Sequence, residues 1–216
     1  VINLRLKPRG LPCGVSLMEI YRHDFYKASG GASIFILSDV HEGTASHNEE
    51  AFKTAISQIE IISKNRPSCV VLNGDLIDCI EVSDKRFNPA EISEKYRLKD
   101  LKDLPKKQAD RVLKNLSPIK HLIKYAIIGN HEESYIREHH FDVYEYYCNA
   151  LGCQKLGSFG IVRFGISAVD EESSSKKKVV IKEYLILDLL MVKVVQEVKH
   201  LVILLIGSKI FLKNLM

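Results

Sequence analysis

The sequence predicts an α/β fold with a parallel or mixed sheet and helices on its faces. Three short apolar segments, 33–39, 68–75 and 124–131, are typical of strands that are buried on both faces. Each is followed by a segment with helical spacing or helical composition, and this alternation indicates a sheet with crossover helices. The chain of 216 residues is long enough for one domain with a sizeable core.

The first residues, 1–32, contain no well-defined element, and we expect an N-terminal lead-in before a core domain at 33–170. After the strand at 33–39, the sequence Ser46-His47-Asn48-Glu49 matches a capping box, which predicts a helix start at Ser46. The helix should end at Pro67, which cannot continue it. Its apolar positions recur at helical spacing: Phe52, Ala55, Ile56, Ile59 and Ile62.

The remaining elements of the core follow the same alternation. The strand at 68–75 precedes a basic stretch that should be helical at 106–116, and the strand at 124–131 precedes a helix at 141–151. Right-handed crossovers place the carboxyl ends of all three strands along one edge of the sheet. Ligands of open α/β sheets bind at that edge.

Composition disfavours several classes of protein. A hydrophobic content of 46% and a charged content of 27% are ordinary for a soluble globular chain, and a net charge of +4 does not by itself indicate nucleic-acid binding. Five cysteines without a C-x-x-C pair disfavour a zinc ribbon or a disulfide framework, and they predict a reducing, cytoplasmic location. The longest clean apolar run near the C-terminus, 201–206, is too short for a membrane span, so we expect no membrane partner.

Each predicted strand ends on side chains that can bind a metal ion. The first leads into Asp39 and His41, the second into Asp75, and the third into Asn130 and His131. Alternate residues of an extended segment share a face, so Asp39 and His41 should be able to bind one ion together. One such strand end would mean little, because polar residues often follow strands. Three at one edge predict a metal site.

The residues around these side chains fit that prediction. Gly74 and Gly129 precede the second and third sets, where they permit tight turns and close backbone approach. Carboxylate, imidazole and amide donors together suit a divalent ion such as Mn²⁺, Fe²⁺ or Zn²⁺, whereas a Ca²⁺ site would use oxygen alone.

The sequences DVH (39–41), GDLID (74–78) and GNHE (129–132) resemble the first three signature blocks of the calcineurin-like metallophosphoesterases, D-x-H, G-D-x-x-D and G-N-H-[DE]. The resemblance covers about 33–165 and implies an α/β/β/α sandwich with two divalent metal ions. Manganese is favoured, with iron or zinc as alternatives.

The resemblance also implies a role for each residue. Asp39 and His41 would bind the first metal, Asp75 would bridge both, and Asn130 would bind the second. His131 would be the catalytic residue, as a general acid or a positive charge beside the leaving group. Two carboxylates would orient these side chains: Asp78 and Glu132.

The resemblance fails in the C-terminal part. The family has a later histidine and a G-H-x-H block, whereas the only histidine after Glu145 is His200, in the context of an apolar strand. We therefore expect 171–216 to be an atypical tail and the fold to be incomplete there. A frameshift near the adenine-rich codons of 176–178 is one hypothesis, which sequencing of the locus would test. A truncation, or a branch of the family with different late ligands, is the alternative.

The expected function is the metal-dependent hydrolysis of a phosphomonoester or phosphodiester, impaired by the loss of late histidine ligands. Cys79 and Ile80 follow Asp78 where protein Ser/Thr phosphatases have Arg-Gly, which disfavours a phosphoprotein substrate. A DNA-directed nuclease of the same fold is an alternative, because the stretch 85–124 has twelve Lys or Arg against five Asp or Glu. That stretch is also typical of a solvated helix face without stacking aromatics. A third alternative is an inactive, metal-depleted remnant that acts as a binding module.

Overall fold

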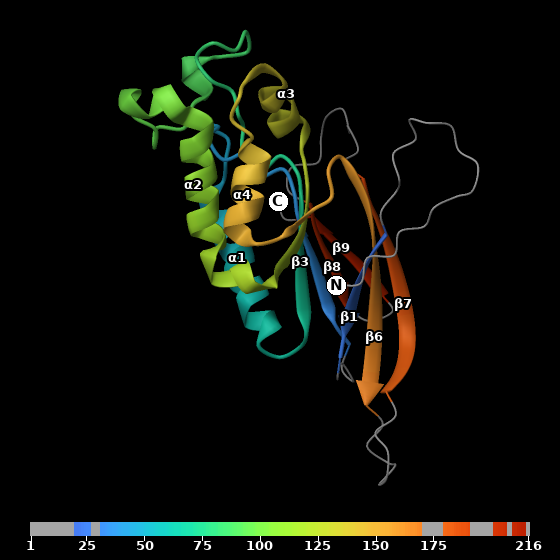
Figure 1. Ribbon diagram of the computed structural model, residues 1–216. Coiled ribbons are helices and arrows are strands. Elements are labelled where there is room, and N and C mark those ends of the chain that lie inside the picture. The colour runs from blue at the N-terminus through green and yellow to red at the C-terminus, as the bar shows by residue number, and fades with distance from the viewer. Residues whose placement is uncertain (1–19, 27–30, 170–178, 191–200, 207–208, 215–216) are drawn as a thin grey trace, which may run out of the picture.

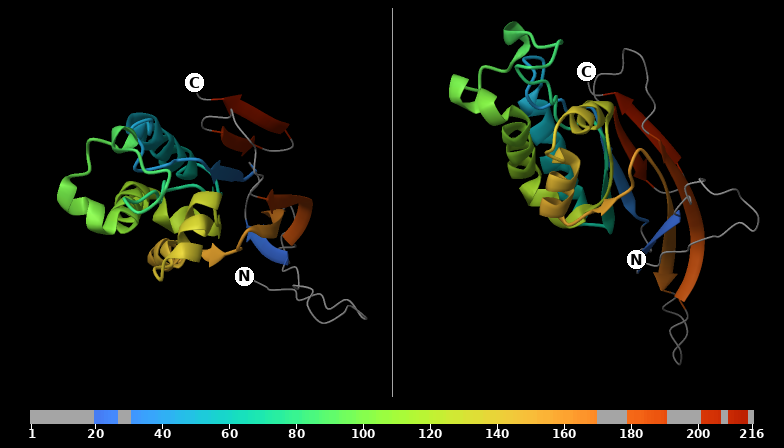
Figure 2. Two further views of the ribbon diagram at one scale, coloured as in Figure 1. Left: turned by 90° about the horizontal axis from the view of Figure 1, so that it is seen from above. Right: turned by 45° about the horizontal axis from the view of Figure 1, so that its top comes forward.

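The computed structural model describes residues 20–26, 31–169, 179–190, 201–206 and 209–214, and it has three layers (Figure 1). Helices form the first layer, a six-stranded sheet the second and a three-stranded sheet the third. Viewed from above, the helices lie on one side of the larger sheet and the smaller sheet on the other (Figure 2).

The larger sheet has the strand order β5-β4-β3-β2-β8-β9. β2 to β5 are parallel to one another, whereas β8 runs antiparallel to β2 and β9 antiparallel to β8. The strands are β2 (Ser33–Leu37), β3 (Ser68–Asn73), β4 (Ile123–Ile127), β5 (Gln154–Lys155), β8 (Leu201–Ile206) and β9 (Lys209–Asn214). The smaller sheet pairs β1 (Ile20–Phe25) in parallel with β6 (Phe159–Val169), which pairs antiparallel with β7 (Val179–Leu190).

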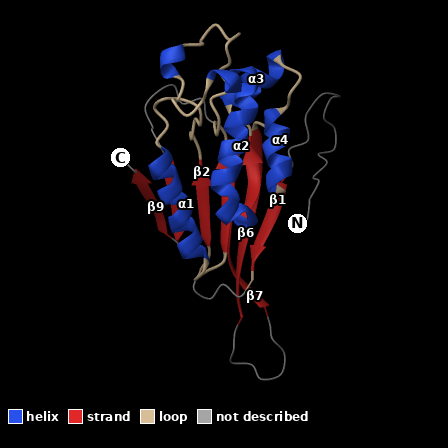
Figure 3. Ribbon diagram, turned by 90° about the vertical axis from the view of Figure 1, so that its left-hand side faces the viewer, coloured by secondary structure: helices blue, strands red, loops and turns tan. Residues whose placement is uncertain are grey.

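The helices connect the parallel strands and cover one face of the larger sheet (Figure 3). They are α1 (Glu49–Ser63), α2 (Leu104–Leu116), α3 (Asn130–Glu138) and α4 (Val143–Leu151), with short 3-10 helices at Pro89–Glu91, Leu98–Asp103 and Ser117–Leu122. The loops that follow β2, β3 and β4 gather with α3 at one end of the molecule. This is the edge at which the sequence predicts a site.

The apolar strands are buried on both faces, as predicted. In β2, Phe35 and Leu37 contact the core beneath the helices, whereas Ile34 and Ile36 belong to a second core that includes residues of both sheets. Because side chains alternate across a strand, one apolar run supplies both cores. Each such side chain contributes about 1.5–3 kcal/mol when fully buried.

The start of α1 differs from the prediction. Its N-cap is Asn48, whose side chain accepts a hydrogen bond from the Ala51 backbone N–H at 3.0 Å. The predicted cap, Ser46, lies two residues earlier, where its hydroxyl lies 3.1 Å from that of Thr44. The capping box at Ser46 is therefore wrong, because Asn48 already satisfies an N–H of the first turn. The apolar face is confirmed, because Ile62 is partly buried against the core and the other four of its five predicted positions are buried: Phe52, Ala55, Ile56 and Ile59.

The predicted mixed α/β class and the parallel order of β2, β3 and β4 are confirmed. Among the described residues no helix covers the outer face of the smaller sheet, so the fourth layer of the expected sandwich is not found there.

The expected division into 1–32, 33–170 and 171–216 stays a prediction. β1 lies in the lead-in, where no element was expected, and β7, β8 and β9 lie in the tail. His200 and 176–178 lie outside the described residues.

Two further expectations can be compared with the described part of the chain. Its four cysteines are free thiols: Cys69, Cys79, Cys148 and Cys153. None of its helices combines the length and the apolar composition that a membrane crossing requires.

Candidate metal centre

Two of the loops at the carboxyl edge run side by side. The Asp39 N–H donates to the Gly74 carbonyl at 3.2 Å, and the His41 N–H donates to the Asp75 carbonyl at 3.0 Å. These backbone hydrogen bonds continue the parallel pairing of β2 and β3 beyond the ends of the strands. The first two candidate blocks are therefore fixed against each other by the main chain.

The side chains of these loops converge. One possible ligand atom from each of Asp39, His41 and Asp75 lies within 4.8 Å of the others. The Nε2 atom of His41 lies 3.9 Å from an oxygen of Asp39, and Asp75 is almost fully buried. Two carboxylates and one imidazole at this spacing can contact a single divalent cation. The donor set that the structure brings together fits a metal ion.

The backbone at this cluster is strained. Asp39, His41, Asp75 and Cys79 have φ of 56°, 46°, 51° and 58°, and they are the only non-glycine residues with positive φ in the part of the chain described. Left-handed backbone costs a non-glycine residue about 1–2 kcal/mol, and such strain gathers at functional sites. Asp39 and His41 thus converge on left-handed backbone. The extended segment assumed from the sequence is wrong, although the two side chains do meet.

Two glycines allow the second and third loops to touch. A Cβ added at Gly74, where φ is 77°, would lie 2.7 Å from the Gly129 Cα atom. A Cβ at Gly129 would overlap both Asp75 and Glu132. The predicted close backbone approach at Gly74 and Gly129 is therefore confirmed, and neither position has room for a side chain.

Glu132 lies beneath the second loop and is fully buried. Its carboxylate accepts hydrogen bonds from three successive backbone N–H groups, those of Asp75 at 3.1 Å, Leu76 at 2.9 Å and Ile77 at 3.4 Å. Burial, and then the charge of Asp75, raise the pKa of Glu132 to about 7, although the backbone hydrogen bonds oppose the shift. Glu132 thus orients the loop that presents Asp75.

His131 is held by two contacts in a fixed orientation. Its backbone N–H donates to Oδ1 of Asp75 at 3.0 Å, and its Nδ1 lies 2.7 Å from the Asp78 carbonyl oxygen. Because a carbonyl only accepts, Nδ1 is the donor there, and Nε2 is the ring nitrogen that takes no part in this contact. The His131 ring meets the His41 ring edge-on, with centroids 4.7 Å apart. The strand expected at 124–131 ends at Ile127, and Asn130 begins α3 with Gly129 as its N-cap.

Asp78 lies next to His131 but faces it mainly through its backbone. Its Oδ1 atom is 3.5 Å from Nδ1 of His131, farther than the carbonyl of the same residue. Burial raises the pKa of Asp78, and the nearby His131 opposes the shift. His41, Asp78 and His131 also form a group with possible ligand atoms within 4.8 Å. His41 belongs to both groups, so the second group adjoins the first.

Asn130 is the first residue of α3, between Gly129 and His131, both of which adjoin Asp75. This location is compatible with a ligand beside Asp75. The role of Asn130 as a ligand of a second cation stays a prediction.

Sequence reasoning missed Glu42, which directly follows His41 and is fully buried among polar groups. The only signal in the sequence is a carboxylate immediately after D-x-H, in a segment that could equally have been an exposed turn.

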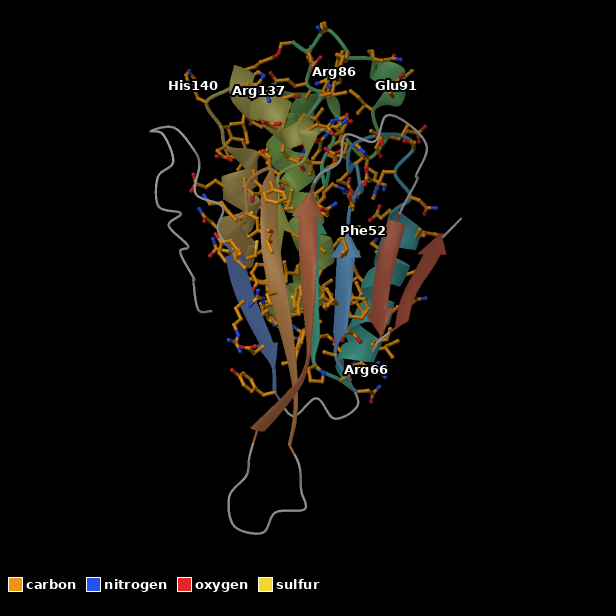
Figure 4. The ribbon with its side chains drawn as sticks, turned by 90° about the vertical axis from the view of Figure 1, so that its right-hand side faces the viewer. Phe52, Arg66, Arg86, Glu91, Arg137 and His140 are labelled. Atoms are coloured by element: carbon orange, nitrogen blue, oxygen red, sulfur yellow. The ribbon has the colours of Figure 1, made fainter. Side chains whose placement is uncertain are left out.

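The basic stretch at 85–124 contains several paired cations. Lys106 lies 3.3 Å from Asp110 and 5.1 Å from the centre of the Tyr146 ring, and Arg86 pairs with Asp84 at 2.7 Å. Such pairs are typical of a solvated surface rather than a free cationic track. Arg86 and Glu91 project at the same end of the molecule as Arg137, opposite Arg66 (Figure 4).

A hollow of the surface lies away from the candidate metal centre. This cavity of about 370 Å³ is found between α1 and α2, and its lining includes Glu49, Lys53, Arg111 and Lys114. None of the residues of the candidate metal centre lines it. The candidate metal centre is therefore identified from the side chains that converge there and not from a surface cavity.

Comparison with known proteins identifies one family. The sequence model described as calcineurin-like phosphoesterase matches residues 32–200, which is more than three quarters of the chain. No curated protein matches the sequence significantly.

Proposed function

The chain belongs to the calcineurin-like phosphoesterase family, and on this premise we propose that it hydrolyses a phosphomonoester or phosphodiester with two divalent cations. The proposal is supported chiefly by one observation, the convergence of Asp39, His41 and Asp75 within 4.8 Å. These residues would hold the first cation, and Asp75 with Asn130 would hold the second. Manganese is the favoured ion, with iron or zinc as alternatives. The free cysteines agree with a cytoplasmic location, which is part of the proposal.

When bound, the cations would supply Lewis-acid chemistry, drawing charge from the phosphate oxygens and acidifying the attacking water. The chain itself would supply the proton for the leaving oxygen. In this proposal His131 donates it from Nε2, because Nδ1 is committed to the Asp78 carbonyl. Imidazole commonly serves as a general acid at physiological pH.

The surrounding residues would keep these groups in place before substrate arrives. Glu132 fixes the backbone that presents Asp75, and the His131 N–H orients the Asp75 carboxylate. Preformed geometry of this kind lowers the barrier because the catalytic groups need not reorganise during the reaction. Without the late histidines, the second cation would have few ligands, so we expect it to bind weakly.

The test is hydrolysis of bis-p-nitrophenyl phosphate while Mn²⁺ is titrated into the purified chain. We expect metal-dependent turnover that is lost in Asp75→Asn and His131→Ala. Two exposed residues provide matched controls, Asp103→Asn and His140→Ala, which should keep the activity. Asp75→Asn should also weaken Mn²⁺ binding, whereas His131→Ala should leave it largely unchanged. A chain with neither turnover nor bound metal would refute the proposal and favour the inactive remnant.

A further inference from the structure

A group of polar side chains around the buried Glu42 adjoins the candidate metal centre without belonging to it. We call it the Glu42 cluster, and its members are Glu42, His47, Tyr96 and Arg111. One oxygen of Glu42 accepts hydrogen bonds from the Tyr96 hydroxyl at 2.9 Å and from Nε of Arg111 at 3.1 Å. The other lies 3.1 Å from Nε2 of His47. The cluster therefore joins three separate segments to the residue that follows His41.

His47 contacts both chain neighbours of His41. Its Nδ1 lies 2.7 Å from the Val40 carbonyl, and its Nε2 faces the Glu42 carboxylate. The His47 side chain is only 2% exposed, so water does not compete strongly for these contacts. The Nε2 contact is close but not aligned as a straight hydrogen bond. We therefore treat it as an electrostatic contact.

The backbone of Glu42 ties the same point to the second loop. Its N–H donates to the Leu76 carbonyl at 3.0 Å, and its carbonyl accepts from the Asp78 N–H at 3.1 Å. Glu42 is thus fixed by its side chain on one side and by its main chain on the other. His41, with φ 46°, lies between Val40 and Glu42, and His47 contacts both of these neighbours.

The charge of Glu42 is compensated inside the protein. Burial alone would raise the pKa of Glu42, but the contacts with His47, Tyr96 and Arg111 outweigh it and lower the pKa overall. Arg111 also lies 3.3 Å from Glu49, so its guanidinium connects two carboxylates. A buried charge with this many partners costs stability if one partner is removed.

We propose that Glu42 and His47 are positioning residues that hold His41 in the left-handed conformation in which its imidazole meets Asp39 and Asp75. Strained backbone persists only where its surroundings over-determine it, and two anchored neighbours provide that constraint. The inference rests on the proposed function only in treating His41 as a metal ligand. The conformational part of it applies to the metal-free chain.

The first experiment measures amide hydrogen exchange by NMR in the metal-free protein at one pH. The side-chain amide nitrogen of Asn can take the place of Nδ1 of His, so His47→Asn should keep the contact with the Val40 carbonyl. The side-chain amide nitrogen of Gln can take the place of Nε2, so His47→Gln should keep the contact with the Glu42 carboxylate. We expect both variants to lower protection of the His41 and Glu42 amides about tenfold, as for the loss of one hydrogen bond. Protection in the centre of β3 should fall only as far as the global stability does.

The control separates positioning from general destabilisation. Ile59 is a core residue of α1 that lies outside the cluster, and Ile59→Val should lower the melting temperature. It should leave the protection of the two amides unchanged relative to the rest of the core. If His47→Asn and His47→Gln have no more effect on these amides than Ile59→Val, the inference is overturned.

The second experiment measures Mn²⁺ affinity by calorimetry. Loss of a residue that orients a ligand typically weakens metal binding about 10–100-fold, and we expect that range for His47→Asn, with no change for Ile59→Val. Unchanged affinity in His47→Asn would refute the positioning of a metal ligand. If the wild-type chain binds no Mn²⁺ but the two His47 variants still lower the protection of the His41 and Glu42 amides, the proposed function is refuted. The conformational role of the cluster is then still supported.

Discussion

Replacement of Glu132 by glutamine should remove a specific pH dependence from the stability of the metal-free protein. The pKa of Glu132 is raised from 4.5 to about 7 in the folded state, first by burial and then by the charge of Asp75. Between these values the folded protein keeps a proton on Glu132 that the unfolded chain has lost. The stability of the wild type therefore falls as pH rises through this window, because the folded state binds more protons.

The size of the effect follows from the shift. Each pKa unit corresponds to about 1.4 kcal/mol, so a shift of this size changes the free energy of unfolding by at most about 3–4 kcal/mol. The glutamine side chain in Glu132→Gln has no proton to lose. The variant should therefore become more stable relative to the wild type as pH rises from about 4.5 to about 7.5, whatever its stability at the acidic end.

The assay is urea denaturation at a series of pH values in the presence of a chelator. Glu133→Gln is a matched control, because Glu133 is the next residue and forms a surface pair with Arg137 at 2.9 Å. Its stability should follow that of the wild type across the window. Saturating Mn²⁺ should reduce the pH effect in the wild type, since nearby cations favour the charged carboxylate. Parallel wild-type and Glu132→Gln curves would refute the account of this buried group.

Four further predictions concern packing, hydrogen bonding and charge. Gly129→Ala should destabilise the fold by about 1–3 kcal/mol and weaken Mn²⁺ binding in the same calorimetric assay, because the added methyl group overlaps the neighbouring loop. Tyr144→Phe should cost about 1–3 kcal/mol in urea denaturation, because the hydroxyl forms hydrogen bonds with three backbone groups, two of them buried. Tyr147→Phe should be neutral or stabilising, since the Tyr147 hydroxyl is buried and has no hydrogen-bond partner in the described structure. Charge reversal at Lys106 and Lys107 should leave DNA binding unchanged, and a large, salt-sensitive loss would instead favour the nuclease alternative.

The sequence was sufficient to predict the elements that are determined by apolar pattern alone. The runs that became β2, β3 and β4 are continuous and short, and α1 shows its buried face at regular spacing. The parallel arrangement follows from the helical crossovers. β1 was missed because only Tyr21 and Phe25 of its six residues are buried, and the rest of the strand is polar or half-exposed.

The candidate site was predictable in its membership but not in its geometry. Asp39, His41 and Asp75 were identified because metal-binding residue types follow successive strands, and the structure brings them together. Their left-handed backbone was not foreseeable, because it depends on hydrogen bonds between two loops that are distant in sequence. For the same reason Glu42 could not be distinguished from an exposed turn residue, since its partner Arg111 is 69 positions away.

The most direct test of the central claim is anomalous X-ray diffraction from crystals grown with Mn²⁺. We expect an anomalous peak within coordinating distance of the carboxylates of Asp39 and Asp75 and the imidazole of His41, and its absence in Asp75→Asn. No peak at these three side chains under saturating Mn²⁺, or a peak that remains unchanged in the variant, would contradict the claim.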